Sequence, residues 1–135
     1  MSCNSGRQFV PYVAADPESY IGKSVGDGQC VAFVKAAAGA PVTSAWRVGT
    51  LVKGAVLAKG TAIATFDANG LYANAPTGNH AAIYLSQDAA GIQVLDQWVS
   101  PGKPPHAVSA RTIRFQGGAA GVSASNNGDL FSVIE

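Results

Sequence analysis

The chain has 135 residues and a net charge of +1, with 47% apolar and 13% charged residues. This balance excludes a disordered chain and favours one globular domain over residues 1–135. The nine basic residues are scattered, which excludes the clustered Lys and Arg of a nucleic-acid-binding protein. No apolar run is long enough to cross a membrane, so we expect neither nucleic acid nor membrane insertion.

The beginning of the chain predicts a short helix. Asp16-Pro17-Glu18 is a typical helix start, with Asp as the cap and Pro in the first turn, and the helix should end near Gly22. The segment 1–7 lacks the apolar stretch of a secretory signal. We therefore expect a protein that is synthesised in the cytoplasm without a signal peptide.

The next helix is predicted to begin at a cysteine. An apolar stripe at i, i+3, i+4 and i+7 should face the core, and it consists of Cys30, Phe33, Val34 and Ala37. Asp27 or Gly28 can cap the helix start, and Gly39 follows its last periodic residue. The Cys30 sulfur would then lie at the N-terminus of a helix, where the helix dipole favours a thiolate.

The second half of the chain predicts strands. Residues 41–60 read as a connector, with a helical turn at Val48, Leu51 and Val52. The content of β-branched residues and the turn residues indicate strands at 61–66, 80–85, 92–98, 108–115 and 130–134. Helices followed by strands predict the α+β class, with N-terminal helices packed on a mainly antiparallel sheet of about four to six strands.

A reactive cysteine needs a base, and the chain has two histidines. His80 begins a strand, whereas His106 lies in a proline-rich loop, so the sheet would hold His80 more firmly. If residue numbers that face each other in the hairpin add up to 176 or 178, His80 and Asp96 lie on one face within contact distance. Asp96 would then accept a hydrogen bond from the imidazole and fix its tautomer.

Further roles and alternatives concern the same residues. Gln29 and the backbone N–H of Cys30 are candidate donors to an oxyanion. Each residue also has an ordinary explanation: Cys30 as a small buried residue, His80 as a capping residue and Asp96 as a hydrogen-bonding partner. A structural Cys3–Cys30 disulfide is another alternative. The two cysteines and two histidines form no zinc pattern, and we expect no metal or cofactor.

The segments around these residues together resemble one group of enzymes. Gly28-Gln29-Cys30-Val31-Ala32-Phe33 resembles the Gly-Gln-Cys signature of the CHAP amidases, which belong to the papain-like NlpC/P60 group. Residues 59–64 resemble the turn and strand before the histidine of that group, residues 79–84 its histidine strand, and residues 94–98 the strand of its third catalytic residue. The resemblance implies a papain-like fold with Cys30 as nucleophile, His80 as base and acid, and Asp96 as orienting residue.

The same resemblance implies cleavage of peptide bonds in bacterial peptidoglycan. A small enzyme of this type is similar to the amidase effectors of type VI secretion, and we expect the third family of those effectors. This implies a toxin that a type VI secretion carrier delivers to a rival's periplasm, and an immunity protein that inhibits its active site. It favours the D-alanine–diaminopimelate cross-link as substrate, with the D-glutamate–diaminopimelate bond within one stem as the alternative.

Loops 67–79 and 99–106 are expected to form the walls of a substrate groove. The candidate groove residues are Trp46, Tyr72, Asn79 and Trp98, with core packing as the alternative for the three aromatic residues. Two other functions on the same fold stay open. One is a binding module that has lost the reaction, and the other is a cysteine acyltransferase that passes the acyl group to an amine.

Overall fold

A computed structural model describes residues 11–135, so Cys3 and the rest of residues 1–10 lie outside the described residues. In this range one α-helix, α1, spans Cys30–Ala38. The strands are β1 Val48–Leu51, β2 Ala62–Thr65, β3 Ala81–Gln87, β4 Gly91–Trp98, β5 His106–Arg114 and β6 Phe131–Ile134. Short 3-10 helices occupy Pro17–Tyr20, Thr43–Ala45, Ala124–Asn126 and Gly128–Leu130.

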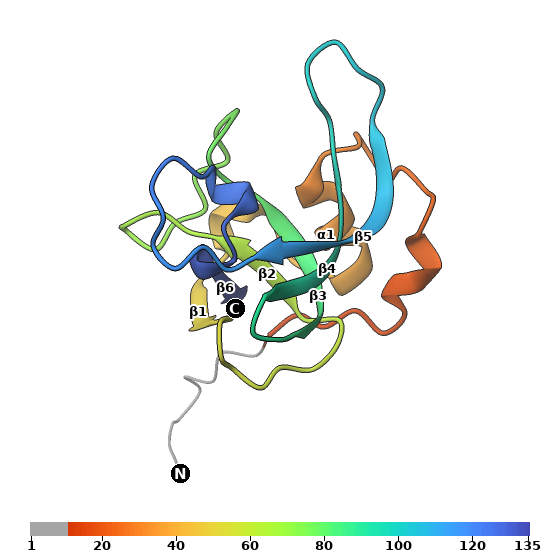
Figure 1. Cartoon of the computed structure of the whole chain (residues 1–135). Coiled ribbons are helices and arrows are strands. Elements are labelled where there is room, and N and C mark those ends of the chain that lie inside the picture. The colour runs from red at the N-terminus through yellow and green to blue at the C-terminus, as the bar shows by residue number, and fades with distance from the viewer. Residues whose placement is uncertain (1–10) are drawn as a thin grey trace.

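The strands form one antiparallel sheet in the order β1-β6-β2-β3-β4-β5 (Figure 1). The α+β class and the number of strands expected from the sequence are thereby confirmed. The hairpin of β3 and β4 has the predicted register, since Ile83 faces Leu95 and Tyr84 faces Val94. The position of β6 between β1 and β2 brings the last strand of the chain into the interior of the sheet.

Helix α1 packs against β3 and β4, and its predicted stripe faces the core. Phe33 and Val34 are fully buried, and Cys30 and Ala37 pack against the same cluster. The strands present small side chains to this cluster, including Ala62, Ala64 and Ala81. These short side chains let the helix lie close to the sheet at normal packing density. The larger Ile63, Tyr84, Ile92, Val94 and Phe131 fill a second cluster of buried residues.

The ends of α1 follow from local backbone conformation. The residue at the N-cap is Gln29, so the prediction of Asp27 or Gly28 as the cap is wrong. Asp27 instead accepts a hydrogen bond from the Gln29 N–H at 2.9 Å, which stabilises the turn before the helix. Gly39 ends the helix in the left-handed conformation, with φ 72°, as its position in the sequence predicts.

Two other local predictions need correction. Val48, Leu51 and Val52 do not form a helical turn, because residues 48–51 form strand β1 at the edge of the sheet. The first predicted helix is only a 3-10 turn, and the Asp16 side chain makes no capping hydrogen bond there. Helix α1 is therefore the one α-helix on the sheet within residues 11–135, where the sequence suggested several. No helix in that range has the length and apolar character needed to span a membrane.

Figure 1 shows the β4–β5 connection as a long loop that projects from the sheet. Its base packs on the turn before α1. Gly28 has φ +85°, and a Cβ added there would meet side-chain carbons of Val99 and Pro105 at 3.0 Å. Only glycine therefore combines this backbone conformation with such close packing. The contact fixes the turn that precedes Cys30 against the end of β4.

We expect Gly60→Ala to destabilise the fold strongly. Gly60 has φ +98°, and an added Cβ would collide with the carbonyl oxygen of Ala14. Gly22 is the matched control, because it has φ +87° and nothing within 4 Å of an added Cβ. Urea unfolding should show a loss of about 1 kcal/mol for Gly22→Ala, from backbone strain alone. It should show about 3 kcal/mol or more for Gly60→Ala. Equal losses in the two variants would contradict this packing.

Candidate active site

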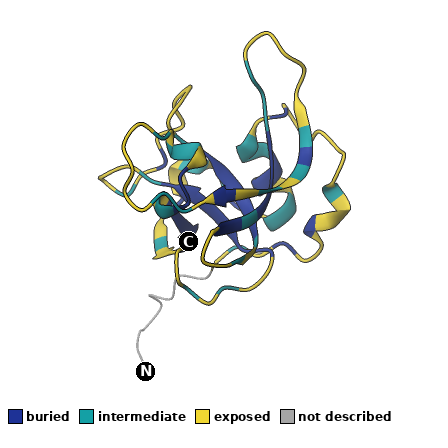
Figure 2. Cartoon of the chain, in the orientation of Figure 1, coloured by how far each residue is buried: buried dark blue, intermediate teal, exposed yellow. Residues whose placement is uncertain are grey.

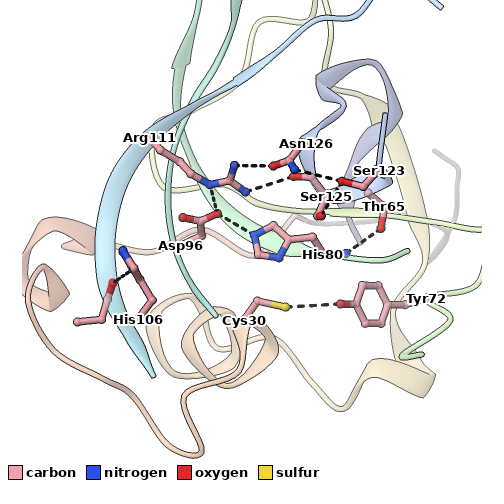
Figure 3. Close-up of polar contacts among 11 residues, drawn as sticks. Cys30, Thr65, Tyr72, His80, Asp96, His106, Arg111, Ser123, Ser125 and Asn126 are labelled. Carbon is pink, nitrogen blue, oxygen red and sulfur yellow. Dashed lines mark hydrogen bonds and ion pairs between the residues drawn. The ribbon is translucent and has the colours of Figure 1, made fainter. Parts of the chain in front are cut away.

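The described thiol lies at the start of α1. Cys30 is the first residue of the helix and carries a free, partly buried thiol. Figure 3 shows its sulfur directed at the hydroxyl of Tyr72, with the ring of His80 above it. The Sγ–Oη distance is 3.7 Å, within the range of a hydrogen bond to sulfur. The helix N-terminus and this hydroxyl both favour negative charge on the sulfur.

The predicted pair of His80 and Asp96 is present. His80 immediately precedes β3, and its ring Nε2 lies 2.7 Å from Oδ2 of Asp96 on β4. The register makes the two residues diagonal neighbours on one face, as the larger of the two predicted sums requires. His80 is 5% exposed and Asp96 is fully buried. The His80 backbone N–H also donates to Thr65 Oγ1 at 3.0 Å, which holds the residue to the end of β2.

The ionisation of this group of residues favours a thiolate–imidazolium pair. Burial opposes charge on Cys30, but hydrogen bonding and electrostatic attraction to His80 outweigh it and hold the pKa of the thiol below its ordinary value. Burial also opposes charge on His80, and the hydrogen bonds to Asp96 and Cys30 outweigh it, which raises the pKa of His80 to about 9. A thiolate beside a protonated imidazole is the reactive form of a cysteine nucleophile.

Tyr72 stays a hydrogen-bond donor in this environment. Burial and the negative charge on Cys30 raise the pKa of the Tyr72 hydroxyl above its ordinary value, so the hydroxyl keeps its proton. Its ring contacts Trp46 with a centroid distance of 4.8 Å, and the Trp46 Nε1–H donates to the Pro41 carbonyl at 2.8 Å. Trp46 therefore supports Tyr72 from the core side.

Arg111 on β5 belongs to the site, although the sequence analysis did not identify it. Its Nε–H donates to Asp96 Oδ2 at 2.7 Å, the same oxygen that contacts His80. Its two terminal nitrogens donate to Asn126 Oδ1 at 3.1 Å and to the Ser125 carbonyl at 3.2 Å. A fully buried carboxylate needs charge compensation, and a basic residue on the strand next to Asp96 is the signal that could have identified Arg111.

Gln97 is a second residue that the sequence analysis missed. Its buried side chain accepts from the Val25 N–H at 2.8 Å and donates to the carbonyls of Val25 at 2.9 Å and Gln29 at 2.7 Å. It therefore ties the turn before α1 to strand β4. Because Asp96 and Gln97 are neighbours on that strand, the position of the thiol and that of the imidazole are set from one point of the sheet.

These residues open into a cleft of about 1240 Å³. Its floor includes Cys30 and His80, and its walls come from four parts of the chain: residues 27–35, residues 74–79, the segment 98–101 and the segment 123–126. The loops that form the walls are mostly exposed, whereas the strands beneath them are buried (Figure 2). Loops 67–79 and 99–106 were predicted as walls, and both contribute, but the wall at 123–126 was not predicted.

The predicted groove residues separate into two kinds. Tyr72, Asn79 and Trp98 line the cleft, whereas Trp46 is 3% exposed and packs in the core. Asn79 bonds both backbone polar groups of Ala75, at 2.6 and 3.1 Å, and so shapes the loop before His80.

The other predicted polar residues lie near the same cleft. Gln29 lines it with an exposed side chain, and its role as an oxyanion donor stays a prediction. His106 begins β5 rather than lying in a loop, and its ring stacks on Trp98 at 3.9 Å between centroids.

Removing the Tyr72 hydroxyl should make the thiolate harder to form. Tyr72→Phe keeps the ring packed on Trp46 and deletes one donor to the sulfur. We expect the midpoint of the Cys30 alkylation rate against pH to rise by up to about one unit, measured with iodoacetamide in a Cys3→Ser background. Tyr84→Phe, which alters a buried tyrosine in the other core cluster, should leave the midpoint in place. An unchanged midpoint in Tyr72→Phe would show that the hydroxyl does not stabilise the thiolate.

Comparison with known proteins agrees with this geometry. Residues 6–134 match the family described as domesticated amidase effector 2. The type VI secretion amidase effector 2 protein of Salmonella typhi is 36% identical over 135 residues, covering 93% of this chain and 100% of that protein. A solved structure of type 6 secretion amidase effector 2 superposes with a TM-score of 0.78 at 37% identity, covering 93% of this chain and 95% of the other.

The comparisons confirm the resemblance to type VI amidase effectors, but the family is effector 2 rather than the third family expected from the sequence. The papain-like fold is likewise confirmed by the structural match. The chain therefore belongs to the domesticated amidase effector 2 family, and it is a hydrolase of the amidase class.

Proposed function

We propose that the protein is a cysteine amidase that cleaves stem-peptide bonds of Gram-negative peptidoglycan, and that Cys30, His80 and Asp96 perform the reaction. The alignment of a thiol, an imidazole and a buried carboxylate at the floor of one cleft is the observation that supports it most directly. Membership of an amidase effector family agrees with this chemistry. The intact dyad favours an enzyme over a binding module.

The proposed reaction begins with attack on the amide. The Cys30 thiolate forms an S–C bond to the carbonyl carbon, and the carbonyl electrons move to the oxygen. The Cys30 N–H, at the start of α1, and Gln29 are the proposed donors to this oxyanion. His80 then gives its proton to the leaving amine as the C–N bond breaks, and a thioester remains on Cys30.

Hydrolysis of the thioester returns the enzyme to its starting state. Neutral His80 takes a proton from water, and the water oxygen attacks the thioester carbon. The S–C bond breaks, and the products are a carboxylic acid, the Cys30 thiolate and protonated His80. Asp96 acts in both halves of the reaction, because its contact with Nε2 leaves the other ring nitrogen free to serve the sulfur and the substrate.

For the scissile bond, we propose the D-alanine–diaminopimelate cross-link. A cross-link continues as peptide on both sides of the bond that is cut. The cleft agrees with such a substrate, because residues 74–79 line it in one part and Val99 and Pro101 in another, with Cys30 at the floor. The alternative is the D-glutamate–diaminopimelate bond of a single stem. A cysteine acyltransferase would use the same dyad and is separated by its product.

We further propose delivery by a type VI secretion carrier into the periplasm of a target cell, because the Salmonella typhi relative and the solved structure are both named as type VI secretion amidase effectors. The proposed partner in the producing cell is an immunity protein that fills the cleft over Cys30. Such a partner would have to contact the exposed loop 74–79, which overhangs His80 in the sequence and lines the cleft.

Mass spectrometry of muropeptides tests the reaction and the bond together. Purified protein and its Cys30→Ala variant are incubated separately with Gram-negative sacculi. We expect the wild type alone to convert cross-linked dimers into monomers, because the variant lacks the nucleophile. Shortened stems would move the cut to the D-glutamate–diaminopimelate bond. A new amide in place of a free carboxylate would indicate acyl transfer, and equal activity of the two proteins would exclude Cys30 as the nucleophile.

The activity should depend on pH in a bell shape. The thiolate is present above the lowered pKa of Cys30, and the imidazolium that protonates the leaving amine is present below about 9. We therefore expect the acid limb below the ordinary range of a thiol and the alkaline limb near pH 9, measured as kcat/KM on a muropeptide dimer. His106→Gln is the control and should keep both limbs. An alkaline limb near 6.5, the ordinary value for histidine, would contradict the pairing of His80 with Asp96.

A further inference from the structure

One carboxylate oxygen of Asp96 serves two donors. His80 Nε2 and Arg111 Nε both lie 2.7 Å from Oδ2, whereas Oδ1 is buried with no hydrogen-bond partner among the described residues. The histidine and the arginine therefore share the charge on a single oxygen. A guanidinium keeps its proton at every working pH, so its charge at this oxygen is permanent.

Arg111 is also held on its outer side. Its terminal nitrogens reach the Asn126 side chain and the Ser125 carbonyl, and Figure 3 shows the guanidinium between Asp96 and this segment. The guanidinium lies 5.5 Å from the ring centre of Trp98, and the side chain is 25% exposed. Three directed hydrogen bonds leave the guanidinium little freedom, so it fixes the orientation of the Asp96 carboxylate.

We propose that Arg111 is a positioning residue of the reaction: it holds Asp96 in place for His80, and its charge limits how tightly Asp96 binds the imidazole proton. The proposal rests on the proposed function, because it concerns the same group of residues. An imidazolium paired with an uncompensated buried carboxylate would release its proton slowly to the leaving amine. Arg111 carries part of that pairing and so keeps His80 able to act as an acid.

The groups that face His80 are few, which makes the effect measurable. The titratable groups that act on its ring are Asp96 from β4 and Cys30 from α1. Strand β6 presents the uncharged ring of Phe131, and β2 presents the Thr65 hydroxyl to the backbone. Arg111 reaches the imidazole only through Asp96. In a Cys30→Ala background, Asp96 is therefore the titratable group left acting on the ring.

The test is an NMR titration of the His80 ring in the full-length Cys30→Ala protein. The chain has two histidines, so a His106→Gln variant assigns the signals. We expect Arg111→Gln to raise the His80 midpoint by about one pH unit, because an opposite charge shared by Asp96 has been removed. Arg114→Gln makes the same substitution at an exposed position of β5 and should leave the midpoint unchanged. An unchanged midpoint in a folded Arg111→Gln protein would overturn the proposal.

Two further variants separate charge from structural support. Asn126→Ala cuts only the outer contact of Arg111, so the His80 midpoint should stay in place, and a shift as large as that of Arg111→Gln would overturn the proposal. Arg111→Lys keeps the charge but cannot make all three hydrogen bonds. It should keep the midpoint, and it decides the question if Arg111→Gln does not fold, since a raised midpoint in the lysine variant would contradict the role of the charge.

The corresponding activity measurement uses the Cys30 protein. We expect Arg111→Gln to lower kcat on a muropeptide dimer about 10-fold to 100-fold, with a smaller change in KM, because the acid step and not binding is affected. A change confined to KM would instead place Arg111 in substrate binding and overturn the proposal. If the wild type cleaves no muropeptide, the titration still tests the role of Arg111, so the two proposals fail separately.

Discussion

The site depends on one fully buried carboxylate. Asp96 lies in the interior of the sheet, where a lone charge would be strongly unfavourable, so it must be compensated by partners that donate to it. His80 and Arg111 are those partners, and they come from the two strands that flank β4. The need to compensate Asp96 thus draws β3, β4 and β5 into one electrostatic unit, and the thiol at the start of α1 benefits from the imidazole charge that results.

Strand β4 places the two halves of the site relative to each other. Asp96 sets the imidazole, and the next residue, Gln97, holds the turn that leads into α1. Close packing of Gly28 on Val99 and Pro105 adds a steric contact to the same turn. Relative motion of thiol and imidazole would therefore break buried hydrogen bonds as well as packing. This is a rigid arrangement of the kind that a nucleophile and its base require.

The sequence was most informative where the signal was local. The apolar stripe from Cys30 to Ala37 and the even register of the hairpin predicted the helix and the His80–Asp96 contact, because both rest on short-range periodicity. Arg111 escaped because its role depends on the pairing of β4 with β5, where Val94 faces Arg111 and Asp96 faces Ser109. The wall at 123–126 lies in a stretch of small polar residues without periodicity. Trp46 looked like a groove residue, but burial depends on the tertiary structure, and its side chain supports Tyr72 instead.

The place of β6 has a consequence for how the chain folds. Strand β1 pairs with β6, and β6 also pairs with β2, so β1 joins the sheet through a segment some eighty residues further along the chain. Contacts of such high sequence separation are formed late, since a long loop must close before they stabilise anything. We expect the helix and the β3–β4 hairpin to form early and the sheet to close last. The Lys53–Asp129 ion pair, at 3.2 Å, spans the same closure at the surface.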